Sequence, residues 1–234
     1  MKRNFLLPFL LLAATVMLPA CATNHSAKSI ETWVVDEQTG QPLEGVIVVA
    51  HWQLERTFAI PPGVTGYDPR GPLQLKVMEA VTDPQGRFYF PAWGPLVAPP
   101  GAYLEVFDPA IVMFKPGYEF YFTAHKPLER IDSTISSTRT SWVDGKTIKM
   151  KKFEGDLKGY ADHLMELGSD LRFISESGHQ HCYWKQIPHM LAAIHKQRQL
   201  FQENKIFDYL PRIDSLLFQD QCGSAQEFLK EYFE

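Results

Sequence analysis

The residues of this chain with the clearest potential for chemistry are histidines and a cysteine in its second half. His179, His181 and Cys182 fall within four positions, and an extended segment would place His179 and His181 on the same side. With Cys182 as a free thiol, or with His189 nearby, this cluster could bind zinc or copper, since both metals accept imidazole and thiolate ligands. The alternative is a polar segment ahead of a helix, with no metal and no cofactor, and this is the one we expect.

The first 21 residues have the pattern of a bacterial export signal. Lys2 and Arg3 precede an apolar run from Phe5 to Met17, which is shorter than the about 20 residues of an ordinary membrane-spanning helix. Leu18-Pro19-Ala20-Cys21 resembles the lipobox of bacterial lipoproteins, in which the cysteine is acylated and the chain is cut just before it. The resemblance implies a signal peptide at residues 1–20 and a lipid anchor, palmitate included, on Cys21.

Residues 21–29 are small and polar enough to form a tether between the anchor and the folded part. Position 22 is Ala rather than the Asp that retains many lipoproteins at the inner membrane, so we expect the outer membrane of a Gram-negative bacterium. The alternative is an ordinary signal peptide that happens to end near a cysteine.

Cys182 and Cys222 are the two cysteines that remain beside Cys21. In an oxidising compartment two thiols most simply form one disulfide, which here closes a loop of about 41 residues. The chain-entropy model assigns such a bridge ~4 kcal/mol of stabilisation before any strain is subtracted. We therefore predict a structural role for both cysteines, and this pairing removes the thiolate from the metal alternative.

Residues 30–153 have the composition of an all-β domain, with short β-branched and aromatic runs between Gly, Pro and Asp turn signals. The sequence predicts strands at 30–35, 46–52, 77–82, 87–90, 103–107 and 118–124, and a hairpin whose two strands flank Asp144-Gly145. Asp83-Pro84-Gln85-Gly86 is typical of a type I turn that reverses the chain. The stretch 53–75 is long for a loop in a compact sandwich, and such insertions are often functional or disordered.

Residues 154–234 change to helical periodicity, which predicts a C-terminal α-helical region and an α+β fold overall. A stripe of apolar residues at helical spacing predicts a single helix of about five turns from Leu157 to Ile174. A second helix is expected to follow Pro188. A third is expected near Pro211, and Ser224 with Glu227 predicts a capped terminal helix. The stripes most simply cover a core, although they could also line a groove for a ligand or partner.

Five segments of residues 30–153 match motifs of a known type of domain: Val35-Asp36, Thr39 to Val46, Ala80 to Asp83, Gly86 to Phe88, and Pro116 to Glu119. Together they resemble the carboxypeptidase regulatory-like domain, a transthyretin-like (prealbumin-like) β-sandwich of Greek-key topology. The resemblance implies a non-catalytic module, because its matched positions are turn and core residues.

The net charge and the absence of common catalytic motifs narrow the range of possible functions. The formal charge is −4, and without Lys2 and Arg3 it is −6, so no basic surface indicates nucleic-acid binding. No Gly-x-Ser-x-Gly, His-Glu-x-x-His, P-loop or dinucleotide motif occurs. His163-x-x-Glu166 has the spacing of a zinc pair, but we expect helix packing there. The sequence thus predicts a lipid-anchored envelope protein that serves in protein binding or structural support, most simply by binding another envelope protein. The alternative is a small-ligand or metal-binding lipoprotein that uses the region from His179 to Cys182, and an enzyme comes third.

Overall fold

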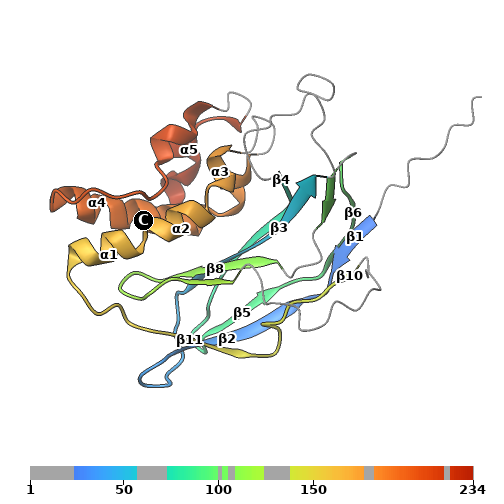
Figure 1. The fold of residues 1–234 in the computed structure, drawn as a ribbon, viewed down its shortest axis with the longest axis horizontal. Coiled ribbons are helices and arrows are strands. Elements are labelled where there is room, and N and C mark those ends of the chain that lie inside the picture. Colours follow the sequence, from blue (N-terminus) through green and yellow to red (C-terminus); the bar gives the residue numbers. More distant parts are fainter. Residues whose placement is uncertain are drawn as a thin grey trace, which may run out of the picture.

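The chain folds into two β-layers with helices covering one of them, an α+β architecture (Figure 1). This computed structural model describes residues 24–56, 73–99, 102–104, 109–123, 138–176, 182–218 and 222–233. Within those ranges, no helix is both long enough and apolar enough to cross a membrane.

The outer β-layer consists of two three-stranded sheets that run end to end. Strands β10 (Thr138–Arg139), β1 (Asn24–Ala27) and β6 (Trp93–Val97) form one sheet, and β11 (Thr147–Met150), β2 (Ile30–Asp36) and β5 (Arg87–Phe90) form the other. In each sheet the central strand has one parallel and one antiparallel neighbour. Two residues separate β1 from β2 and β5 from β6, so each pair continues in one direction across the layer.

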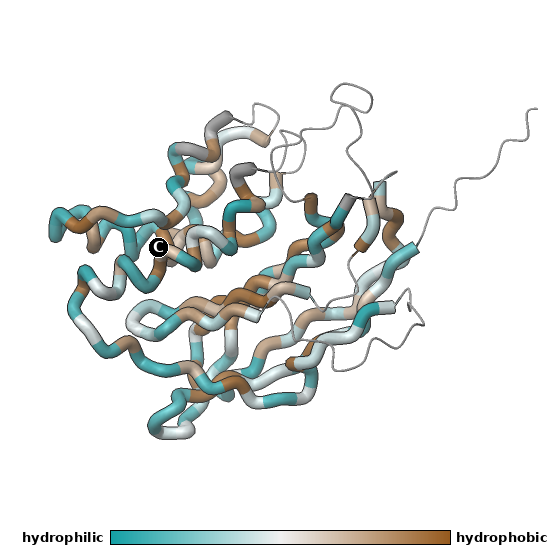
Figure 2. The backbone as a smooth tube through the Cα atoms, in the orientation of Figure 1, coloured by the Kyte–Doolittle hydropathy of each residue, from teal (hydrophilic) through white to brown (hydrophobic). Residues whose placement is uncertain are grey.

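The central β-layer is an antiparallel sheet in the order β4-β3-β8-β9, with β7 also paired to β3. Its strands are β3 (Ile47–Arg56), β4 (Leu73–Val81), β7 (Ala102–Leu104), β8 (Ala110–Phe114) and β9 (Tyr121–Thr123). Along β8, Ile111 and Met113 pack toward the outer layer, whereas Val112 and Phe114 pack toward the helices. Hydrophobic residues accordingly concentrate on this sheet (Figure 2), and its strands β3 and β8 are buried on both faces.

The helical layer follows the last strand and shares a core with the central sheet. It contains α1 (Leu157–His163), α2 (Met165–Asp170), α3 (Phe173–Glu176), η1 (Tyr183–Gln186), α4 (Pro188–Glu203), η2 (Ile213–Phe218), α5 (Ala225–Phe228) and η4 (Leu229–Tyr232). Its buried side chains, such as Leu164, Trp184 and Leu191, lie in one cluster with Ile47 and Val112 of the sheet.

Several predicted elements are confirmed, with shifted ends. The strands expected at 30–35, 46–52, 77–82 and 87–90 correspond to β2, β3, β4 and β5. The strand expected at 118–124 is shorter, and of the one expected at 103–107 only residues 103 and 104 lie in a described strand. Strands β1, β6, β8 and β10 were not predicted, and β1 lies within the proposed tether. Residues 53–56 and 73–75 of the supposed insertion belong to strands, while 57–72 lie outside the described residues.

The predicted hairpin at Asp144-Gly145 is wrong. Residues 142–145 form a turn, and the strand after it, β11, pairs in parallel with β2. The turn is held by β2 itself, since Glu31 N donates to Asp144 Oδ1 at 2.8 Å and Gly145 N donates to Glu31 O at 2.7 Å. Asp144 and Gly145 therefore bond to the neighbouring strand β2 instead of closing a hairpin.

The single helix predicted from Leu157 to Ile174 is also wrong, although its buried face is right. The helix is interrupted at Leu164 and again at Leu171, which gives the three short helices α1, α2 and α3. Both leucines are fully buried, as are Leu167 and Ile174. The three short helices therefore still present one row of apolar side chains to the sheet. The third predicted helix forms as the 3₁₀ helix η2, and the cap at Ser224 is confirmed by a 3.2 Å bond from Glu227 N.

A buried polar network joins the central sheet to the helical layer. His51 of β3 stacks on Phe173, with ring centroids 4.6 Å apart, and its Nδ1 donates to Gln74 Oε1 at 2.9 Å. Tyr183 of η1 bonds the same residue of β4, since its hydroxyl accepts from Gln74 N at 3.0 Å and donates to Gln74 O at 2.8 Å. Burial raises the pKa of Tyr183 to about 12 and lowers the pKa of His51 to about 4.

The lowered pKa of His51 predicts a defined acid sensitivity. The folded state favours the neutral form of His51. The contribution of this neutral side chain to the free energy of unfolding is therefore complete above pH 6.5 and is lost as the pH falls toward 4. The shift corresponds to about 3 kcal/mol. His51→Gln, which cannot titrate, should lose less of its free energy of unfolding between pH 6.5 and 4, by about that amount, in urea titrations at each pH. Parallel curves for the two proteins would contradict this assignment.

Candidate functional site

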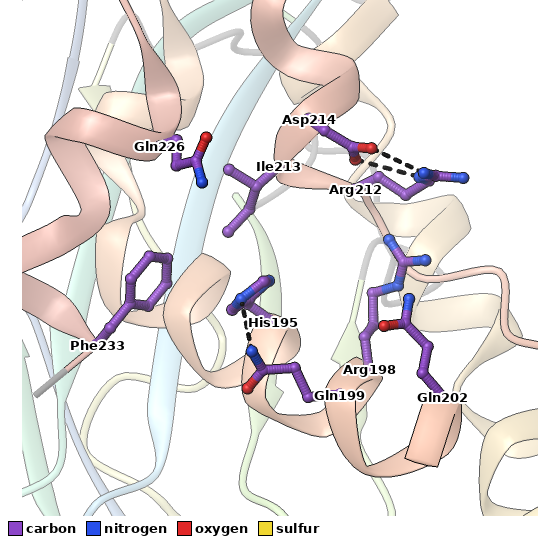
Figure 3. A pocket seen from close by; sticks show the side chains of 9 residues that line it. All are labelled: His195, Arg198, Gln199, Gln202, Arg212, Ile213, Asp214, Gln226 and Phe233. Carbon is purple, nitrogen blue, oxygen red and sulfur yellow. Dashed lines mark hydrogen bonds and ion pairs between the residues drawn. The ribbon is translucent and has the colours of Figure 1, made fainter. Parts of the chain in front are cut away.

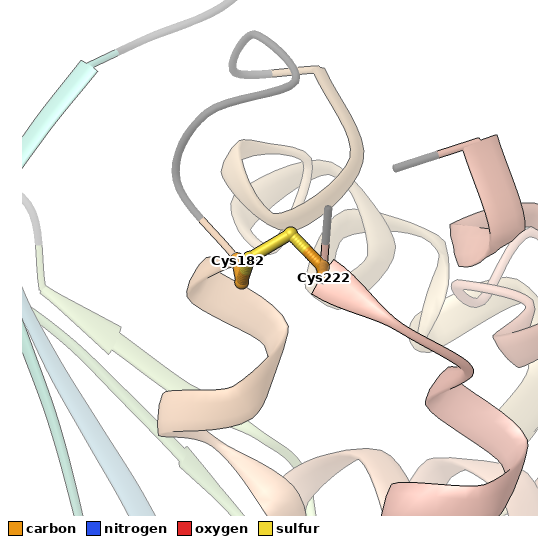
Figure 4. Close-up of a disulfide and its surroundings, with 2 residues drawn as sticks. All are labelled: Cys182 and Cys222. Atoms are coloured by element: carbon orange, nitrogen blue, oxygen red, sulfur yellow. A yellow bond between two sulfur atoms is a disulfide. The ribbon is translucent and has the colours of Figure 1, made fainter. Parts of the chain in front are cut away.

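The predicted disulfide is present. Cys182, just before η1, is bonded to Cys222, just before α5, with their Cα atoms 5.6 Å apart (Figure 4). The bridge spans a separation of 40 residues and ties the two ends of the segment that contains α4 and η2. A cysteine in a disulfide offers no thiolate, so the zinc or copper alternative loses its sulfur ligand.

The other residues singled out for chemistry do not form a metal centre in the described part of the chain. Cys21, His179 and His181 lie outside the described residues. His189 contacts Glu79, and His163 Nε2 accepts a 3.2 Å hydrogen bond from Phe120 N while Glu166 is exposed. Among the described residues, no group of three His, Cys, Asp or Glu side chains could hold a metal ion.

A cavity of about 250 Å³, lined by both polar and apolar groups, opens on the side of α4 that does not face the sheet (Figure 3). One wall is a single face of α4, made of His195, Arg198, Gln199 and Gln202. The opposite wall comes from the C-terminal segments and consists of Arg212, Ile213, Asp214, Gln226 and Phe233. At roughly 30 Å³ per water, the cavity has room for about eight waters.

Charges around the cavity are paired. Arg198 Nε lies 2.8 Å from Asp208 Oδ1, and both side chains are largely buried. The exposed Arg212 donates to both carboxylate oxygens of Asp214, at 3.1 and 2.7 Å, and this contact lowers the pKa of Asp214. Neither arginine is therefore an uncompensated positive charge.

His195 contributes a largely neutral imidazole to this wall. Burial, and then the nearby Arg198, lower the pKa of His195, against an opposing effect of Asp214. Its Nε2 lies 3.1 Å from Gln199 Nε2, and its ring packs on Phe233 with centroids 4.9 Å apart. The arrangement offers hydrogen-bonding groups beside an aromatic ring, without a net charge.

The position of α4 depends on a carboxylate from the sheet. Ile187 precedes the helix and offers no side-chain cap. Instead Glu79 of β4, whose side chain is 5% exposed, accepts from His189 N at 3.0 Å and from Met190 N at 2.7 Å. It also accepts from His189 Nδ1 at 2.8 Å. Burial raises the pKa of Glu79 in spite of these bonds, so desolvation offsets part of the gain.

Sequence reasoning missed both the cavity and the cap. The spacing of His195, Arg198, Gln199 and Gln202 on the polar side of the predicted second helix was the available signal, but such a face is usually only solvated. The opposite wall and Glu79 come from distant parts of the chain, and their approach is a tertiary property. Comparisons with protein families, curated proteins and solved structures find nothing that matches this chain.

The cap makes a prediction about α4. Glu79→Ala leaves two N–H groups at the start of the helix without their acceptor and should lower the free energy of unfolding by about 1–2 kcal/mol. Glu79→Gln keeps one acceptor oxygen and should cost less. The matched control is Glu44→Ala in an exposed turn, expected within about 0.5 kcal/mol of the parent. Equal losses for Glu79→Ala and Glu44→Ala in urea unfolding would disprove the cap.

Proposed function

We propose that this chain is a lipid-anchored cell-envelope protein, held at Cys21 in the outer membrane of a Gram-negative bacterium, with a non-catalytic β-sandwich that binds another envelope protein. The observation that carries the proposal is the short distance in sequence between the anchor and the fold. Ala22 and Thr23 alone separate Cys21 from β1. At about 3.5 Å per residue, this spacing keeps the start of β1 within about 10 Å of the acylated cysteine.

That spacing gives the protein an orientation at the membrane. Strand β1 and helix α4 lie toward opposite ends of the long axis of the molecule (Figure 1). With Cys21 acylated, the β1 end sits at the bilayer surface and α4 projects away from it. The helical layer is then the part presented to a partner. The disulfide supports an envelope location as well, because such bonds persist in oxidising compartments.

The transthyretin-like resemblance remains part of the proposal, and the positions that carry it have structural roles here. Tyr118 Oη donates to Asp36 Oδ2 at 3.0 Å, which joins two of the matched segments. Thr39 N donates to Asp36 Oδ1 at 2.8 Å and is the main cause of the lowered pKa of Asp36. Gly86 N donates to Asp83 O at 2.8 Å and closes the turn between β4 and β5. These contacts favour a module whose matched residues build the fold rather than catalyse a reaction.

The partner surface that we favour lies just beyond α4. Phe207 and Tyr209 are 73% and 60% exposed, and their rings pack edge to face with centroids 4.9 Å apart. The backbone of Tyr209 rests against α2, where a Cβ at Gly168 would lie 2.5 Å from Tyr209 O. A fixed backbone and a paired, exposed aromatic surface are typical of anchors in protein interfaces.

The partner surface is tested by crosslinking in living cells. A photoreactive phenylalanine at position 207, in the full chain with its native Cys21, should form an adduct with one dominant envelope protein. The control carries the same group at Lys149, which is exposed on β11 in the outer β-layer, and should not form that adduct. Adducts only with abundant neighbours, or equal capture at both positions, would count against this surface.

The anchor is tested by acylation. Growth with an alkyne fatty acid should label the chain, and Cys21→Ser should abolish the label because it removes the acylated thiol. Cys182→Ser leaves Cys21 in place and should keep the label. A signal retained in Cys21→Ser, measured by fluorescence after click coupling, would refute the lipid anchor.

A further inference from the structure

The cavity beside α4 has the chemistry of a site for an uncharged ligand. The positive charges on its walls are already paired, Arg198 with Asp208 and Arg212 with Asp214. An anion would have to compete with one of these carboxylates, and a cation would meet the arginines. A neutral molecule can bind without displacing a carboxylate and without repulsion from the arginines.

The groups left to bind such a ligand are carboxamides. Gln202 and Gln226 stand on opposite walls, and neither side chain hydrogen-bonds to a residue that the structure describes (Figure 3). Each carboxamide has an oxygen that accepts and an NH₂ that donates. Two neighbouring hydroxyl groups of a sugar offer the matching acceptor and donor, so one amide can hold a pair of them.

The cavity also has an apolar part. Phe233 and Ile213 lie beside the carboxamides, and the ring of Phe233 is held against His195. A pyranose presents one face of C–H groups that packs on an aromatic ring, while its hydroxyl groups project from the edge. The volume of about 250 Å³ suits a single sugar residue rather than a longer chain.

We propose that this cavity is a binding site for a neutral sugar residue, held by Gln202 and Gln226 with its apolar face on Phe233. The residues that line the cavity do not include Phe207, Tyr209 or Cys21. The proposal goes beyond protein binding in the envelope and does not depend on it.

Saturation-transfer difference NMR on the full chain in detergent tests the site. The probes are glucose, galactose and N-acetylglucosamine, with glucuronate and trialanine as charged-sugar and peptide comparisons. We expect a signal from at least one neutral sugar, with a Kd of about 1 mM for so small a ligand. Gln202→Leu with Gln226→Leu should weaken that binding at least tenfold, whereas Gln186→Leu, exposed on η1 outside the cavity, should leave it unchanged.

Three results would overturn the sugar site: no signal from any neutral sugar, a signal unaffected by the double variant, or binding of glucuronate or trialanine alone. Circular dichroism of the double variant establishes that its fold is retained, as both positions are exposed. Crosslinking at position 207 in the same double variant separates the two proposals. An unchanged adduct with lost sugar binding assigns the two interactions to two sites.

Discussion

The two middle strands of the central sheet, β3 and β8, are buried on both faces, and the rest of the fold follows from this burial. Strands β3 and β8 carry apolar side chains at successive positions, and Ile111, Val112, Met113 and Phe114 are all fully buried. A strand with only one apolar face could expose its other face to water, as in a two-layer sandwich. Because these strands have two apolar faces, a third layer is required, and the helices after β11 supply it.

Covering the second face also determines where polar groups lie. Glu79, Gln74 and His51 are on the central sheet and take part in its contacts with the helical layer, and each has a hydrogen-bonding partner there or on a neighbouring strand. Glu79 fixes the start of α4, and the disulfide from Cys182 fixes the segment before it. The cavity lies on the outer side of α4, the helix whose start these contacts hold against the sheet.

Much of the fold was predictable, and the failures have physical causes. The turn at Asp83 and the buried stripe through Leu164 depend on local residues, and both are found. Strand β8 was missed because a strand buried on both faces lacks the alternation that marks a half-buried one. Asp144-Gly145 was misread because β2 competes for its hydrogen bonds, which no local pattern encodes. The cavity was missed for the same reason, since its walls approach only in the folded chain.

The helical layer and the central sheet share one hydrophobic core, so we expect them to unfold as one unit. Native-state hydrogen exchange of the full chain measures this directly, by comparing slowly exchanging amides of β3 with those of α4 across low urea concentrations. A shared core predicts that both groups exchange through the same global unfolding, with one free energy and one dependence on urea. If α4 exchanged through an opening of clearly lower free energy while β3 stayed protected, the helices would be a separate domain and the sheet and helices would not form one folding unit.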